Sequence, residues 1–131
     1  MSTSARATFA IGGWDEQPYE EAADGRKLTR ATVEQTFSGD IEGDGSVQWL
    51  MAYRPDGTAD FVGLQRITGA FGERSGRVVL SSSGTFDGQV ARGTLTVLDG
   101  SGTDGLEGIA GSGSFEAPMG GEPVVTLEYD L

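Results

Sequence analysis

SVQWLMAYRPDGTADFVGLQRITG, residues Ser46–Gly69, is the stretch that reveals most about how this chain folds. It predicts two long strands joined by a tight turn at Arg54-Pro55-Asp56-Gly57, because proline sets the first central backbone angle of such a turn and glycine accepts the left-handed angle that follows. Successive side chains of a strand point to opposite faces, so each strand has one face rich in large apolar residues. These faces carry Val47, Trp49, Met51 and Tyr53 on the first strand and Phe61, Gly63, Gln65 and Ile67 on the second. Gln65 is a polar group in an otherwise apolar row, which marks it as a candidate functional residue.

The rest of the chain also alternates strand-like segments with turns. Six further strands are expected at Arg6–Trp14, Lys27–Ser38, Arg77–Phe86, Gln89–Leu98, Ala110–Glu116 and Glu122–Tyr129. Polar or glycine-rich connections are expected at Asp15–Arg26, Gly39–Gly45, Gly72–Gly76 and Asp99–Gly105, with a tight hairpin turn at Asp87-Gly88. Little or no helix is expected.

Eight short strands at near-regular spacing are typical of a sandwich or a barrel. We favour an all-β fold, a closed antiparallel eight-stranded barrel of the lipocalin-like type. Closure leaves no strand edge exposed, and eight strands leave room inside for one small ligand. The length of 131 residues suits one domain spanning residues 1–131.

The composition excludes several classes of function. Nine basic against 20 acidic side chains give a formal net charge of −11, which disfavours nucleic acids and anionic membrane surfaces as partners. The chain has no cysteine and no histidine, so metal sites with nitrogen or sulfur ligands are excluded, and no metal or cofactor is expected. No apolar run resembles a signal peptide or a membrane span, which predicts a cytoplasmic protein.

Two glycine-rich motifs are weighed against ordinary turns. Gly100–Gly105 matches the phosphate-binding pattern GxGxxG, but that motif needs a following helix, and here the chain leads towards another strand. Asp40–Gly45 resembles the start of a calcium loop, but its twelfth position is Met51 instead of a glutamate. We interpret both as turn sequences.

A hydrolase with paired carboxylates is also disfavoured. Such an enzyme needs two acids that converge in a cleft. Asp15 and Glu16 are expected at the rim of the barrel. The other strand acids, Glu34, Asp60, Glu116 and Glu128, alternate away from the large apolar residues.

The inward rows predict an apolar chamber with a few polar groups, which is the usual composition of a small-molecule site. Its expected ligand-binding residues are Trp14, Phe37, Trp49, Met51, Phe61, Leu80 and Ser82, and its candidate catalytic residues are Tyr53 and Gln65. The alternative is a filled hydrophobic core in which Tyr53 and Gln65 hydrogen-bond to each other. The alternation of side chains fits both equally well.

Several segments resemble a bacterial domain family of unknown function. They are Trp14–Tyr19, Phe37–Gly43, Leu50–Gly57, Phe61–Leu64, Ser83–Gly88, Gly102–Gly108 and Gly113–Pro118, and together they span nearly the whole chain. That family is in turn similar to the small barrels of allene oxide cyclases and dirigent proteins. The resemblance implies a closed antiparallel barrel whose cavity holds an apolar, reactive substrate in one folded conformation. Catalysis would rely on shape and a few polar groups.

The chain departs from the family pattern at three positions. The resemblance implies a glutamate where Gln65 stands, and histidines where Ser82 and Met119 stand. Three hypotheses follow: a cyclase or isomerase that acts by confining an apolar substrate, a non-catalytic carrier or sensor of an apolar ligand, and an oligomeric structural protein with a filled core. In the third, outward-facing Leu50, Val62 and Leu64 would contact a second copy of the chain.

Overall fold

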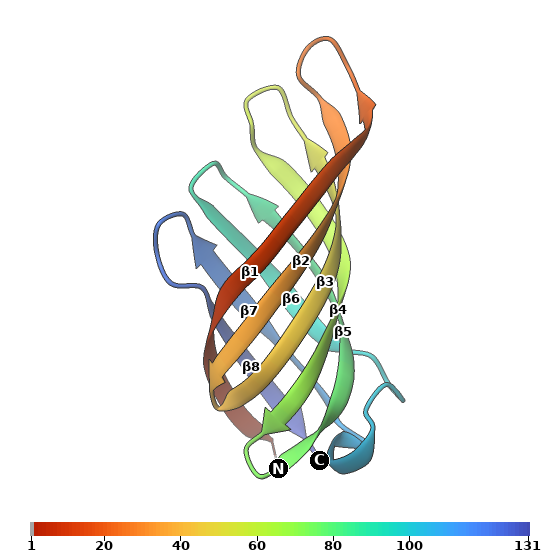
Figure 1. The fold of residues 1–131 in the computed structure, drawn as a ribbon, viewed down its shortest axis with the longest axis vertical. Helices are drawn as coiled ribbons and strands as arrows, with labels where there is room; N and C mark the ends of the chain where they lie inside the picture. Colours follow the sequence, from red (N-terminus) through yellow and green to blue (C-terminus); the bar gives the residue numbers. More distant parts are fainter. Residues whose placement is uncertain (1) are drawn as a thin grey trace.

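Eight antiparallel strands follow one another around a closed barrel in the order in which they occur in the sequence (Figure 1). The computed structural model describes residues 2–131. The strands are β1 (Thr3–Glu21), β2 (Lys27–Gly39), β3 (Ile41–Tyr53), β4 (Ala59–Phe71), β5 (Arg74–Phe86), β6 (Val90–Val97), β7 (Ala110–Pro118) and β8 (Val124–Asp130). A single helical turn, η1 (Asp104–Leu106), lies between β6 and β7. The predicted fold class is confirmed, and no helix in the described residues is long enough and apolar enough to span a membrane.

The central hairpin has the predicted turn. Gly57 adopts a left-handed φ of +88°, and its N–H donates a hydrogen bond of 3.0 Å to the carbonyl of Arg54. The paired strands β3 and β4 put Trp49 opposite Gly63 and Met51 opposite Phe61. The large side chains of both strands therefore share the inside of the barrel, where Trp49, Met51 and Phe61 are buried.

The predicted loop at Asp15–Arg26 is wrong over its first half, because β1 continues to Glu21. Residues up to Glu21 pair with β2, whereas β8 pairs with β1 only from Thr3 to Thr8. The second half of β1 therefore has a neighbouring strand on one side only. Most of its side chains are exposed, so it lacks the apolar alternation that identifies a strand in the sequence.

The predicted turn cluster at Gly39–Gly45 is also mostly strand, since β3 begins at Ile41. Gly43 and Gly45 lie within β3, where they allow the neighbouring strands to approach closely. A Cβ atom on Gly45 would lie 2.6 Å from the Phe37 ring and 3.1 Å from Oε1 of Gln35. Gly45 therefore makes room for two inward-facing side chains of β2.

The interior has two apolar clusters. The first fills the end of the barrel where both termini and η1 lie (Figure 1), and it contains Ala5, Ala7, Phe9, Phe37, Ile41, Ile67, Phe71, Val78, Leu80, Leu95, Val97, Leu106, Ile109, Val125, Leu127 and Tyr129. We call it the packed end. The second contains Ala31, Val33, Val47, Trp49, Met51, Ala59 and Phe61. Its side chains leave space between them, and we call it the hollow end.

The outer wall carries the apolar row that the sequence predicts. Leu50 pairs with Val62, and Leu64 lies further along the same strand as Val62. About half of each of these three side chains is exposed, at 49%, 53% and 53% respectively. Contact with a second copy of the chain through this row stays a prediction.

Candidate functional site

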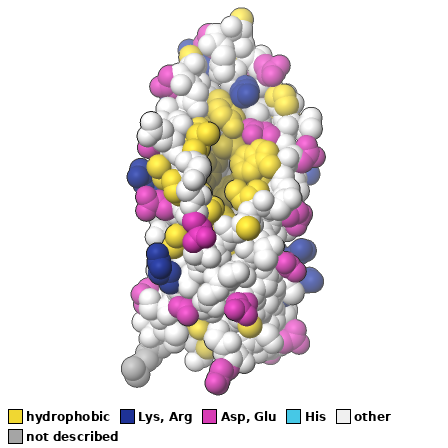
Figure 2. Space-filling view, turned by 60° about the vertical axis from the view of Figure 1, so that its left-hand side comes forward, with side chains coloured by type: hydrophobic (Ala, Val, Ile, Leu, Met, Phe, Trp, Pro, Cys, Tyr) yellow, Lys and Arg dark blue, Asp and Glu magenta, His cyan; other side chains and the backbone are white. Residues whose placement is uncertain are grey.

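A cavity of about 510 Å³ occupies the hollow end of the barrel. Its mouth lies in the side wall of the barrel, between β1 and β8. The pairing of these strands ends at Thr8 and Val124. One further hydrogen bond, of 3.1 Å, runs from the N–H of Phe9 to the carbonyl oxygen of Pro123. Beyond that bond, β1 diverges from the turn between β7 and β8. Figure 2 shows the hollow and the hydrophobic side chains that wall it.

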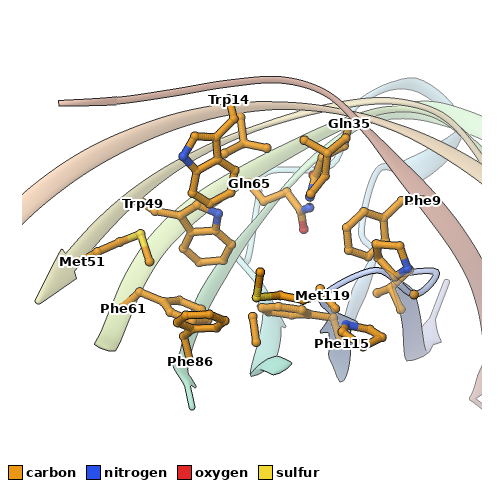
Figure 3. A pocket seen from close by; sticks show the side chains of 18 of the residues that line it. Phe9, Trp14, Gln35, Trp49, Met51, Phe61, Gln65, Phe86, Phe115 and Met119 are labelled. Carbon is orange, nitrogen blue, oxygen red and sulfur yellow. The ribbon is translucent and has the colours of Figure 1, made fainter. Parts of the chain in front are cut away.

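Aromatic rings from several strands line the cavity (Figure 3). Trp49 and Phe61 meet edge to face with ring centroids 4.7 Å apart, and Phe115 lies 6.0 and 6.1 Å from them. Such pairs stabilise a fold by about 0.5–1.5 kcal/mol beyond their buried area. Gly63 makes the arrangement feasible, since a Cβ atom there would lie 2.6 Å from the Trp49 ring.

Two glutamine side chains form the floor between the hollow end and the packed end. Nε2 of Gln65 on β4 donates a hydrogen bond of 2.6 Å to Oε1 of Gln35 on β2, across the intervening strand β3. Gln65 is only 6% exposed, and its own Oε1 has no hydrogen-bond partner among the described residues. In Figure 3 the amide of Gln65 points into the space between the aromatic rings.

A carboxylate organises the polar groups beside the mouth. Glu16 accepts hydrogen bonds from the Thr29 hydroxyl (2.6 Å), the Tyr53 hydroxyl (2.8 Å) and Nε1 of Trp14 (3.0 Å). Lys27 Nζ lies 4.8 Å from the centroid of the Tyr53 ring. Tyr53 and Trp14 line the cavity, so the anionic Glu16 stands directly behind its wall.

These contacts fix the charge states at the mouth. Burial alone raises the pKa of Glu16, but the hydrogen bonds from Thr29, Tyr53 and Trp14 and the charge of Lys27 together outweigh it. The pKa of Glu16 therefore lies below its ordinary value of 4.5. Burial, then the hydrogen bond to Glu16 and its negative charge, raise the pKa of Tyr53 well above its ordinary value of 10.0. At neutral pH Tyr53 is thus a neutral phenol and Glu16 an anion.

The structure brings most of the predicted site residues together. Trp14, Phe37, Trp49, Met51, Tyr53, Phe61 and Gln65 line the cavity, while Leu80 and Ser82 are buried inside the barrel but do not line it. Leu80 and Phe37 both belong to the packed end, but only Phe37 borders the cavity. The alternative in which Tyr53 and Gln65 hydrogen-bond to each other is wrong, because each has another partner.

Two polar residues of the site were not predicted. Gln35 occupies an inward position of β2, as Gln65 does on β4. The available signal was a polar residue between Val33 and Phe37, the apolar residues on the same face of the strand. The role of Glu16 had no such signal, because the segment around it resembles a loop in sequence. Met119 carries no predicted role, but it belongs to the turn at the mouth and lines the cavity.

Comparisons with known proteins concern the family and the fold. The family model described as "Protein of unknown function (DUF3224)" matches residues 5–129. No curated protein matches the chain. Among solved structures, the crystal structure of a protein with unknown function from the DUF3224 family of Shewanella oneidensis MR-1 is similar, with a TM-score of 0.80 and 24% sequence identity. The match covers 100% of this chain and 98% of that one, and at this identity it shows a shared fold.

Proposed function

The chain belongs to the DUF3224 family of proteins of unknown function, and we propose that it binds an apolar small molecule inside its barrel. The observation that supports this most directly is the cavity of about 510 Å³ with its aromatic wall and its two glutamines. Small-molecule sites commonly measure about 300–1,000 Å³ and combine apolar walls with a few polar groups. The similarity to allene oxide cyclases and dirigent proteins stays a prediction.

The energetics of the hollow end favour a guest molecule. Rings such as Trp49, Phe61 and Phe115 have no partner atoms on the side that faces the cavity, so they lack part of the dispersion energy of a packed core. An apolar ligand supplies those contacts and gains about 25 cal/mol for each Å² of apolar surface removed from water. A core filled by the protein's own side chains, as the structural hypothesis requires, has no support in this half of the barrel.

Binding can be measured with N-phenyl-1-naphthylamine, a neutral apolar dye whose fluorescence rises in apolar surroundings. The chain has two tryptophans, Trp14 and Trp49, and both line the cavity, so energy transfer from tryptophan to dye reports binding at this site. We expect saturable binding with efficient transfer. Native mass spectrometry of the purified protein tests for a ligand that co-purifies.

A pair of matched variants locates the dye. Ala117 lines the cavity, whereas Ala52 is exposed on the outer wall of β3. Ala117→Phe fills part of the cavity, so we expect it to weaken dye binding at least tenfold, while Ala52→Phe leaves the affinity unchanged. Absence of saturable binding, or equal effects of the two variants, contradicts the proposed function.

A second candidate function is a cyclisation or isomerisation by confinement. It is favoured by the positions of Tyr53 near the mouth and Gln65 at the floor, because polar contacts at two ends of one cavity hold a flexible substrate in a folded conformation. Holding reacting atoms together in this way lowers a barrier by several kcal/mol without a general acid or base. In this candidate Tyr53 and Gln65 are the polar contacts, and Trp49, Met51 and Phe61 are the walls.

Incubation with polyene and epoxide substrates separates the enzyme from the carrier. If the protein is an enzyme, we expect the wild type to form a cyclised or isomerised product faster than buffer alone. Tyr53→Phe and Gln65→Leu should each slow product formation while the dye still binds. If every substrate is recovered unchanged although it binds, the carrier or sensor is the remaining function.

A further inference from the structure

Oε1 of Gln65 is a buried hydrogen-bond acceptor without a partner among residues 2–131. The side chain is 94% buried, since 6% of it is exposed, and its amide nitrogen is already bonded to Gln35. A buried polar atom without a partner costs about 1–3 kcal/mol. Because this atom belongs to a residue that lines the cavity, a bound molecule with an N–H or O–H group is able to supply the missing bond.

The charge distribution restricts which chemical group of a ligand can reach the floor formed by Gln35 and Gln65. The cavity is lined by aromatic, aliphatic and glutamine side chains, and none of its lining residues within residues 2–131 is lysine or arginine. An anion at the floor would therefore be desolvated without a compensating charge. The ionised Glu16 behind Tyr53 and Trp14 adds repulsion at the mouth, which the nearby charge of Lys27 offsets in part.

We propose that the ligand enters with an uncharged hydrogen-bond donor leading, and that Gln65 Oε1 accepts its hydrogen bond at the floor. The ligand class is thus an apolar alcohol or a comparable neutral O–H or N–H compound, and not a carboxylate such as an ionised fatty acid. This proposal rests on the proposed function, because it assigns the chemistry of a ligand in the same cavity. Gln35 is a positioning residue here, since its acceptance of the Nε2–H bond holds the Gln65 amide in place.

Three probes of similar size test the proposal: octan-1-ol, its isomer heptyl methyl ether, and octanoate, which is anionic at neutral pH. Each is measured by displacement of N-phenyl-1-naphthylamine and by isothermal titration. For the wild type we expect octan-1-ol to bind more tightly than the ether, and octanoate at least tenfold more weakly than octan-1-ol. Gln65→Leu should reduce the ratio of alcohol affinity to ether affinity by about tenfold, which is the effect of losing one hydrogen bond.

Two further variants test whether the effect of Gln65→Leu comes from the lost hydrogen bond to the ligand. Gln65→Leu leaves Oε1 of Gln35 without its donor, so the double variant Gln35→Leu/Gln65→Leu removes both amides and should give the same loss of ratio. Ser82→Ala is the matched control. The Ser82 hydroxyl is also buried and has no hydrogen-bond partner in the part of the chain that the structure describes, but it does not line the cavity. This variant should leave the ratio unchanged. Circular dichroism checks that each variant is folded.

The outcomes separate the two proposals. Equal affinity of the wild type for alcohol and ether, an unchanged ratio in both Gln65 variants, or octanoate binding as tightly as octan-1-ol overturns the donor proposal while binding itself remains. If neither the dye nor any probe binds, the proposed function fails and the donor proposal fails with it.

Discussion

Tyr53 donates a hydrogen bond of 2.8 Å to Glu16, and this bond connects β3 to the part of β1 that β8 does not cover. Thr29 on the intervening strand β2 donates to the same carboxylate oxygen over 2.6 Å. One carboxylate thus ties three neighbouring strands together beside the mouth of the cavity. The half of β1 beyond Thr8 has no neighbouring strand on the β8 side, so it is held by its backbone pairing with β2 and by side-chain contacts such as these.

The carboxylate of Glu16 should make stability depend on pH in the acid range. Its pKa in the folded protein lies below the ordinary value of 4.5, so its contribution is present above about pH 4.5 and is lost as the pH falls through the folded pKa. We expect Glu16→Gln to lower the midpoint of thermal unfolding at neutral pH, and the difference from the wild type to shrink as the pH falls below 4.5 through the folded pKa of Glu16. Circular dichroism melts over this range measure it. Glu20→Gln, at an exposed position of the same strand, is the control, and an equal effect of both changes would refute the role of Glu16.

The phenol of Tyr53 should resist ionisation at alkaline pH. Its pKa is raised above 10.0, so the stability that the neutral phenol contributes is fully present below pH 10.0 and is lost as the pH rises through the higher folded pKa. In absorbance titrations, the difference between the wild type and Tyr53→Phe should have no step near pH 10.0 in the folded protein. The step should return when both proteins are unfolded in urea. A step at the ordinary pKa in the folded protein would mean that the bond to Glu16 does not form.

Gly63 should be intolerant of a side chain. A Cβ atom there would lie 2.6 Å from the Trp49 ring and 2.3 Å from the carbonyl oxygen of Gln48. We expect Gly63→Ala to destabilise the protein by about 1–3 kcal/mol, as overpacking does elsewhere, and to shift the tryptophan emission. Gly12→Ala is the matched control, because a Cβ atom at Gly12 has no neighbouring atom within 4 Å. Urea denaturation measures both, and equal stabilities would contradict the close contact of Trp49 with Gly63.

Substitution of Leu80 should mainly reduce stability, whereas substitution of Met51 should mainly change dye affinity. Leu80 is 1% exposed within the packed end, so Leu80→Ala should cost about 2–5 kcal/mol of stability and leave dye affinity unchanged. Met51 faces a cavity that already exists, so Met51→Ala should cost less stability and alter dye affinity. Urea denaturation and dye titration on the same samples measure the two quantities. Weaker dye binding by Leu80→Ala would place Leu80 at the cavity, as the sequence had predicted.

Where the chain buries one face of a strand, the sequence predicts the structure well. Val47, Trp49 and Met51 recur at every second position, and Pro55 and Gly57 define the turn that follows, so the inward rows and the hairpin are readable from local patterns. Long inward rows on both strands also favour a barrel. Leu80 shares this alternation, but the depth of a residue along the barrel depends on strand stagger, which a local pattern does not contain. This is why the sequence assigned Leu80 to the ligand.

Contacts between strands account for what the sequence did not reveal. Gln35 and Gln65 are 30 residues apart and meet across β3, which requires the registers of three strands to be known. Glu16 lies in a stretch whose side chains are mainly exposed, and its three donors come from β1, β2 and β3. Such convergence depends on the folded arrangement, so the polar groups of the site were found only in the structure.

The uncovered half of β1 also exposes main-chain amides and carbonyls that would template the strand of another molecule. Several features of Ile11–Glu21 make pairing with a strand of another molecule unfavourable. The register shifts between Ile11 and Gly13 and between Pro18 and Glu20, and Pro18 lacks an N–H to donate. Acidic side chains at the end of the strand add charge repulsion between copies. The open side of the barrel is thereby protected against fibrillar self-assembly, and replacing Pro18 and the nearby acids would remove that protection.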